Sequence, residues 1–177
     1  MEKSTWVIDP THSEIGFKVK HMMFTNVSGK FNAFDVVIEN DHDKFETSET
    51  RFSADVKSID TDNEDRDNHL RSGDFFEVDV YPKISFTSTE IKKISDAVFQ
   101  VSGDLSIKNV TKNIVLETEY SGLMQDPWGN TKIGLSLAGK INRKDFGLTW
   151  NSTLETGGVL VGEEIKLLSE IQLIKQH

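Results

Sequence analysis

Apolar and polar residues alternate along most of this chain, and that alternation limits the folds it can adopt. In Ser13–His21, for example, Ile15, Phe17 and Val19 share one face with His21, while lysines and Glu14 occupy the other. A two-residue period is typical of a β-strand with one buried face. Because such segments follow one another through short turns, the pattern predicts sequential antiparallel strands.

The alternation predicts about eight strands and an all-β fold. A phase slip near Ala33 predicts a bulge in the second long strand. Sequential antiparallel strands close naturally into a barrel, which removes unpaired edges. We therefore expect one domain over residues 1–177, an extended eight-stranded antiparallel barrel with one short helix. The extended segments are Trp6–Asp9, Ser13–His21, Val27–Glu39, Phe45–Ser58, Lys83–Ile94, Val98–Lys108, Asn113–Tyr120, Lys132–Asn142 and Glu163–Lys175, with turns at Met22–Asn26, Asn40–Lys44 and Asn109–Lys112 and loops at Arg143–Trp150 and Thr156–Gly158.

One segment, Ile59–Phe76, breaks the alternation and predicts a short helix. Thr61 and Glu64 fit a capping box at its start, and Gly73 is placed to end it in the left-handed conformation. Between these caps Leu70 is the one large apolar residue, so the helix cannot be the core of a bundle. It is either a solvated connector or a polar plug over the end of a hollow structure.

Charge and composition exclude several classes of function. The net charge of −9 and a pI near 5.0 argue against a nucleic-acid partner, and they disfavour binding to anionic lipid by charge alone. The chain has no cysteine, which excludes thiol nucleophiles, iron–sulfur clusters and Cys-ligated zinc. Its start, MEKSTWVIDP, shows no apolar region of signal-peptide length, and no run reaches transmembrane length. We therefore expect a cytoplasmic location.

Periodicity leaves open whether the barrel is filled or hollow. An eight-stranded barrel has an interior that side chains can just fill, or that holds one small ligand. Gly103 and Gly139 fall on the inward phase, where small residues leave room. The chain also has 11 Phe residues, which could fill the same space.

Six segments jointly resemble the YceI-like family, which has a lipocalin-like fold. They are WVIDPTHSEIGFKVKH (Trp6–His21), VSGKFNAF (Val27–Phe34), IDTDNEDRDNHLRSGDFF (Ile59–Phe76), YPKISFTS (Tyr81–Ser88), VSGDLSIKNVTKNIVL (Val101–Leu116) and INRKDFGL (Ile141–Leu148). They occur in the family's order and cover most of the chain. The resemblance implies a barrel that holds a polyisoprenoid or similar long-chain lipid in its lumen. In the turn after LSI, Asn109 stands where the family has Gly, and it tolerates the same left-handed conformation.

The expected lipid-binding residues are of two kinds. Inward-facing apolar side chains form the lumen, and polar groups from the first motif, the helix and the late loop could meet a head group. Arg66 and Arg143 have a second interpretation, mutual ion pairs with Asp65 and Asp145, and we favour that structural role for all four. The predicted ligand-binding residues are Phe17, Val19, His21, Phe31, Phe52, Phe86, Leu105, Ile107, Leu135, Leu137, Arg66, His69 and Arg143. The Met22–Phe24 turn is expected to act as an adaptable apolar gate.

The leading hypothesis is non-enzymatic binding, storage or transport of an elongated isoprenoid-type lipid, either a polyisoprenoid or an isoprenoid quinone. No recognised catalytic motif occurs, and His12, His21 and His69 show no zinc-ligand spacing, so we expect no catalytic residues, metal or cofactor. One alternative is an enzyme acting on a lipid or quinone, with His21 and His69 as acid–base groups. Another is a ligand-free stress-response barrel. The apolar loops are also compatible with a homodimer.

Overall fold

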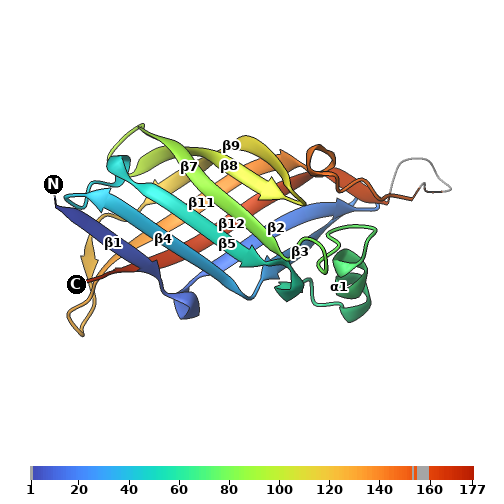
Figure 1. Ribbon diagram of the computed structural model, residues 1–177, viewed down its shortest axis with the longest axis horizontal. Coiled ribbons are helices and arrows are strands. Elements are labelled where there is room, and N and C mark those ends of the chain that lie inside the picture. Colours follow the sequence, from blue (N-terminus) through green and yellow to red (C-terminus); the bar gives the residue numbers. More distant parts are fainter. Residues whose placement is uncertain (1, 153, 155–159) are drawn as a thin grey trace.

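The computed structural model describes residues 2–152, 154 and 160–177. It confirms the predicted eight-stranded antiparallel barrel with one α-helix (Figure 1). The strands are β1 (Lys3–Ile8), β2 (Glu14–His21), β3 (Thr25–Phe31), β4 (Phe34–Asp41), β5 (Glu49–Asp55), β6 (Ile59–Asp60), β7 (Lys83–Lys93), β8 (Val98–Ile107), β9 (Val110–Tyr120), β10 (Met124–Gln125), β11 (Thr131–Asn142) and β12 (Val161–Lys175). The expected loop Thr156–Gly158 lies outside the described residues.

Twelve labelled strands form eight barrel strands because three of the eight are interrupted. β1 and β2 both pair with β12. On their other edges β1 pairs with β4, and β2 pairs with β3. In the same way β5 pairs with β4, and β6 pairs with β3. β7, β8, β9, β11 and β12 are continuous, the short β10 adds a hairpin to β11, and the β11–β12 ladder closes the barrel.

The interruptions correct two sequence predictions. Val27–Glu39 is not one strand with a bulge but β3 and β4, separated at Asn32–Ala33. The predicted strand Phe45–Ser58 is strand only in its middle, since 3₁₀ turns form at Phe45–Thr47 and Val56–Ser58. Asn32–Ala33 and Val56–Ser58 lie side by side, where the Asn32 N–H donates to the Ser58 carbonyl at 3.2 Å. The wall therefore bends at one level across neighbouring strands.

Three turns place two successive residues in the left-handed region, and the last of them joins β8 directly to β9. The pairs are Met22–Met23, His42–Asp43 and Lys108–Asn109, with φ between 50° and 65°. This backbone matches the twist of the strands and normally selects Asn, Asp or Gly. The third turn is shorter than the predicted Asn109–Lys112, because β9 already begins at Val110.

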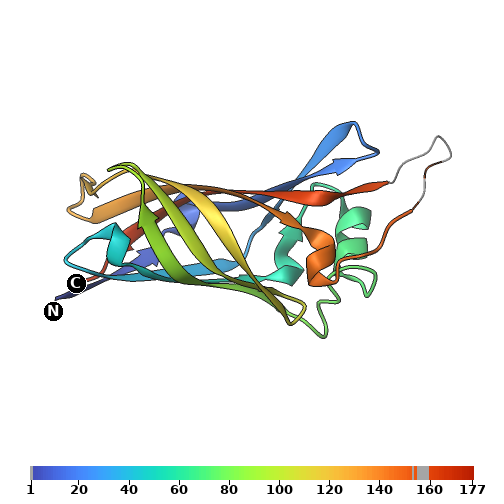
Figure 2. The ribbon, with the colours of Figure 1, turned by 90° about the horizontal axis from the view of Figure 1, so that it is seen from above.

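The helix α1 (Glu64–Arg71) lies across the end of the barrel opposite the termini (Figures 1 and 2). Its caps differ from the prediction. Asn63 is the N-cap, and its side chain accepts from the Arg66 N–H at 2.9 Å. Thr61 is instead buried, where it donates to Asp67. Ser72 ends the helix in an extended conformation, and Gly73 has no positive φ. In the described residues no helix is long and apolar enough to cross a membrane.

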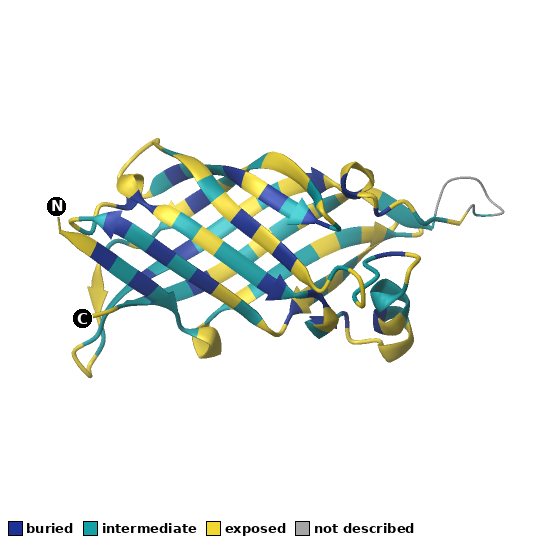
Figure 3. Ribbon diagram, viewed as in Figure 1, coloured by how far each residue is buried: buried dark blue, intermediate teal, exposed yellow. Residues whose placement is uncertain are grey.

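The barrel is densely packed at the end where both termini lie, which we call the base. Trp6, Phe45 and Phe99 are almost fully buried there. The Phe45 ring stacks on Tyr120 at 5.0 Å and meets Phe99 edge-on at 4.9 Å between centroids. Such aromatic pairs add to the stability from burial. Buried and exposed residues alternate along the strands as the sequence pattern predicts (Figure 3).

Candidate functional site: an apolar cavity in the barrel

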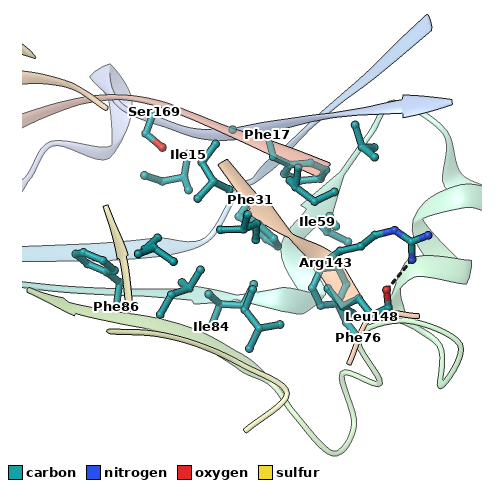
Figure 4. Close-up of a pocket in the computed structure, with 18 of the residues that line it drawn as sticks. Ile15, Phe17, Phe31, Ile59, Phe76, Ile84, Phe86, Arg143, Leu148 and Ser169 are labelled. Atoms are coloured by element: carbon teal, nitrogen blue, oxygen red, sulfur yellow. Dashed lines mark hydrogen bonds between the residues drawn. The ribbon is translucent and has the colours of Figure 1, made fainter. Parts of the chain in front are cut away.

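Above the aromatic base the barrel encloses a cavity of about 370 Å³ (Figure 4). Its floor is formed by Phe45, Leu135 and Ile171, and inward side chains of β2, β3, β5, β7, β8, β9, β11 and β12 form its wall. At the far end, which we call the mouth, α1 and the residues after β11 cover it. The wall is almost wholly hydrocarbon. The hollow interior left open by the periodicity is thus present in the upper barrel, and the filled interior is present at the base.

All thirteen predicted ligand-binding residues line this one cavity. Phe17, Phe52 and Leu137 are partly exposed to it, whereas Leu105 and Leu135 are buried in its wall. Val19, Phe31, Phe86 and Ile107 lie on the same wall, His21 lies near its upper rim, and Arg66, His69 and Arg143 lie at the mouth. That these residues contact a ligand stays a prediction.

The cavity also includes residues that the sequence analysis missed. Ile15 and Ile84 are in phase with the predicted set and could have been added to it. Leu148 and Trp150 lie in a segment without periodicity, so their position depends on tertiary structure. Ser169 is a polar exception on the wall (Figure 4). Its cross-strand partner is Leu137 on β11.

Inward glycines make room for aromatic rings, not for open space. A Cβ atom on Gly103 would lie 2.3 Å from the Phe86 ring. Gly29 is the cross-strand partner of Phe17, and a Cβ there would also lie 2.3 Å from that ring. Gly139 faces a Leu116 methyl group in the same way, at 2.7 Å. The rings therefore lie flat over glycine, which keeps the centre of the lumen open.

Arg143 closes the mouth, and its partners contradict the predicted ion pair. It lies in the 3₁₀ helix Arg143–Phe146, within the expected loop, and its side chain is buried. The guanidinium donates to four backbone carbonyls, those of Leu148 (2.6 Å), Gly162 (2.8 Å), Trp150 (2.9 Å) and Val161 (3.3 Å). Burial lowers the pKa of Arg143 from its usual value. Because these carbonyls occupy the donors, the side chain ties three chain segments together without a carboxylate.

Arg66 and the buried Asp67 form a second polar cluster at the mouth. The Arg66 guanidinium donates to the Thr61 hydroxyl at 2.8 Å and to the Thr61 carbonyl at 2.6 Å. Asp67 accepts from both the backbone N–H and the hydroxyl of Thr61. Asp65 and Asp145, the predicted partners of the two arginines, are exposed and make no ion pair among the described residues. The expected network of four charges is therefore wrong. Arg66 donates to Thr61, and Arg143 donates to backbone carbonyls.

His69 joins the helix to the mouth through aromatic contacts. Its ring lies edge-on to Trp150 at 4.6 Å and to Phe75 at 5.1 Å between centroids. Its Nε2 atom is 2.8 Å from a carboxylate oxygen of Asp74. Leu70 and these rings form the side of the mouth cover that faces the lumen. The helix is therefore a plug over the barrel end, the second of the two predicted roles.

The Met22–Phe24 turn does not behave as the expected gate. None of its three side chains lines the cavity, and they are 44%, 58% and 84% exposed. The β2–β3 hairpin extends beyond the mouth, so its tip points away from the lumen (Figure 2). Among the described residues, no three His, Asp or Glu side chains group so that they could hold a metal ion.

Known proteins resemble this chain in both sequence and architecture. A model of the YceI-like domain matches residues 6–173. UPF0312 protein SAS2572 of Staphylococcus aureus is 38% identical over 164 residues, covering 92% of this chain and 93% of that protein. The solved YCEI protein of Campylobacter jejuni is 35% identical with a TM-score of 0.77, and the match covers 96% and 97% of the two chains. A polyisoprenoid-binding domain of Saccharophagus degradans shares the fold at 14% identity, with a TM-score of 0.69 and coverage of 97% and 98%.

Proposed function

The chain belongs to the YceI-like family, and from this premise we propose that it binds and carries or stores an elongated isoprenoid-type lipid. The observation that carries the proposal is the long apolar cavity, closed at the base and plugged at the mouth. The Saccharophagus degradans domain that shares this fold is a polyisoprenoid-binding domain, which supports the same class of ligand. Removal of apolar surface from water, at about 25 cal/mol per Å², would drive binding with few polar contacts.

The length of the lumen suits an extended chain. Cavity-lining residues of β12 run from Val161 to Ile171. Ten residue steps at about 3.3 Å, on strands tilted by about 40°, correspond to a lumen of roughly 25 Å. A polyisoprenoid or isoprenoid quinone would lie along this axis with its polar end at the mouth.

The charges at the mouth support that orientation. The inward-facing ionisable side chains that line the cavity within the described residues are all basic: His21, Arg66, His69 and Arg143. Such groups donate hydrogen bonds to carbonyl, hydroxyl or phosphate oxygens. The apolar end of the ligand would then contact the aromatic floor.

We propose that the protein is not an enzyme. Among the described lining residues there is no carboxylate to act as a base, and Ser169 makes no hydrogen bond with a histidine. A hydroxyl nucleophile needs an adjacent base within hydrogen-bond reach. His21, and His69 with its Asp74 contact, would have to act on a substrate that the apolar wall only positions.

Native mass spectrometry of the freshly purified protein, followed by solvent extraction, tests the proposal directly. We expect one isoprenoid-type lipid per chain. Bare protein that also fails to bind added prenols and quinones would contradict it.

A matched pair of variants tests the position of the ligand. Leu137→Trp should fill the middle of the lumen opposite Ser169 and abolish lipid binding, because Leu137 borders the open space. Val115→Trp is the control, since Val115 faces outward on β9 and is 48% exposed. Equal binding by both variants would place the ligand outside the barrel.

A further inference from the structure

Three observations on one side of the mouth have no role in lipid storage. The first is the tip of the β2–β3 hairpin, Met22–Phe24, where three adjacent apolar side chains face solvent and Phe24 is 84% exposed. Scattered exposed apolar residues are normal, but a contiguous apolar tip marks an interaction site. The tip extends past the barrel on the side of the mouth (Figure 2).

The second observation is that this tip uses unfavourable turn residues. Met22 and Met23 have φ values of 52° and 65°, and the Phe24 N–H donates to the His21 carbonyl, as in a type I′ turn. Asn-Gly is the preferred pair for this backbone, and non-glycine residues lose stability there. The other two such turns have Asp or Asn at their second position. A local rule broken without a structural gain points to a functional site.

The third observation is a row of lysines on the outer wall beside the tip. Lys18 pairs with Lys166, and Lys166 pairs with Lys140, so three exposed lysines lie directly opposite one another on β2, β12 and β11. Like charges in this arrangement destabilise a sheet. Lys20 and Lys30 lie on the same side, on β2 and β3.

Charge along this wall goes from acidic to basic between Glu14–Glu170 and the lysine row, and Glu163 and Glu164 follow on β12. The base half carries the pair Glu14–Glu170. The next row toward the mouth has Gly16, Leu168 and Ala138 as cross-strand partners, with Lys30 opposite Gly16 on β3, and the lysine row follows it. Lys140 also lies 4.0 Å from Glu164, and the nearby Glu163 pairs with Lys144. A chain of net charge −9 thus presents cations beside its apolar tip.

We propose that the Met22–Phe24 tip and the lysine row form a docking surface for an anionic lipid bilayer. The aromatic and thioether side chains would enter the interfacial region, while the lysines attract lipid phosphates within a Debye length of about 10 Å. The Glu14–Glu170 pair would point away from the membrane. Docking in this orientation places the plugged mouth of the cavity at the bilayer surface, and it does not depend on the identity of the cargo.

Sedimentation with vesicles tests this surface. The full chain is mixed with vesicles of phosphatidylcholine alone or of phosphatidylcholine with phosphatidylglycerol. We expect binding to the anionic vesicles, at least about tenfold weaker binding without phosphatidylglycerol, and a further decrease with added salt. Equal binding to both vesicle types, or to neither, would overturn the proposal.

Two variants of the tip separate docking from folding. Met22→Asn with Met23→Gly supplies the preferred turn residues, so the protein should unfold at an equal or higher urea concentration while vesicle binding falls about tenfold or more. Phe24→Gln should lose binding without altering the turn. Trp128→Gln is the control, because Trp128 is 82% exposed on the β10–β11 hairpin at the base.

A charge variant completes the test. Lys18→Glu with Lys166→Glu should abolish binding to anionic vesicles, whereas Lys92→Glu, on β7, should not. Loss of binding in the Trp128 or Lys92 controls would contradict the assigned surface. A change from dimer to monomer in the Met22–Met23 variant, without loss of vesicle binding, would assign the tip to a second copy of the chain instead. Vesicle binding that persists when Leu137→Trp excludes cargo would separate docking from storage.

Discussion

The two halves of the barrel are built on the same alternating strands but have opposite interiors. At the base, Phe45, Phe99 and Tyr120 meet in a dense aromatic cluster, and Trp6 is fully buried. Above it the strands carry equally apolar residues, yet they surround a cavity of about 370 Å³. Periodicity therefore establishes which side chains face inward, while the sizes and directions of those side chains decide whether they meet. The comparison can be tested by changing each half in turn.

The largest difference is expected when one Phe is truncated in each half. Phe99→Ala should destabilise the protein by about 3–5 kcal/mol, because it leaves a void in a packed cluster. Phe52→Ala should cost only about 1–3 kcal/mol, since its ring already borders open space. Urea unfolding of both variants measures the two costs. Equal costs would mean that the upper barrel is packed as densely as the base.

The stability of the mouth should depend on the Arg143 guanidinium, as the stability of the base depends on aromatic packing. Arg143→Met retains much of the side-chain volume but removes the donors to four carbonyls, so we expect a loss of about 3 kcal/mol. Arg51→Met is the control, because Arg51 is exposed and pairs with Glu39 on the surface, and it should cost under about 1 kcal/mol. Equilibrium unfolding gives both values, and a loss at Arg143 no larger than the control would show that the carbonyls find other donors.

Acid should weaken the connection between β1 and β2. Burial alone would raise the pKa of Asp9, but hydrogen bonds with His12, Thr11 and Lys132 outweigh it and lower the pKa to about 2. Because the folded-state pKa lies below the ordinary 3.8, the stabilisation is complete above about pH 4 and is lost as the pH falls toward 2. Its size is at most about 2 kcal/mol.

Asp9→Asn should therefore lower stability at pH 7 and flatten the acid limb of a plot of unfolding free energy against pH. The wild type and the variant should converge near pH 2. A variant that keeps the full slope between pH 4 and pH 2 would assign the acid sensitivity to other carboxylates.

The smallest effect is expected at the plug. Asn63→Ala removes the N-cap of α1 and should cost about 1 kcal/mol. Amide hydrogen exchange should accelerate in Glu64–Arg71 while the amides of the base stay protected. Glu64→Ala, which removes the residue that the sequence pattern placed in a capping box, should change much less. The reverse order would restore Thr61 and Glu64 as the cap.

Much of the wall could be predicted from the sequence, and much of the mouth could not. Phe17, Phe86 and Leu135 lie on the cavity wall because a strand's period fixes their face. Leu148 and Trp150 follow no period, and no sequence signal states that Arg143 will meet carbonyls. The helix caps show a third case. Thr61 and Asn63 both suit an N-cap, and the contact of Thr61 with Asp67 leaves Asn63 to cap the helix. The cytoplasmic location stays a prediction.

The strand interruptions at Pro10–His12, Asn32–Ala33 and Val56–Ser58 have a consequence for how such a barrel can vary. In an unbroken strand, inserting one residue reverses the inward and outward faces along its whole remaining length. Here an insertion at an interruption can be absorbed there, so β4 keeps its register when β3 changes. The lower barrel can therefore serve as a constant foundation while the length and width of the upper lumen change.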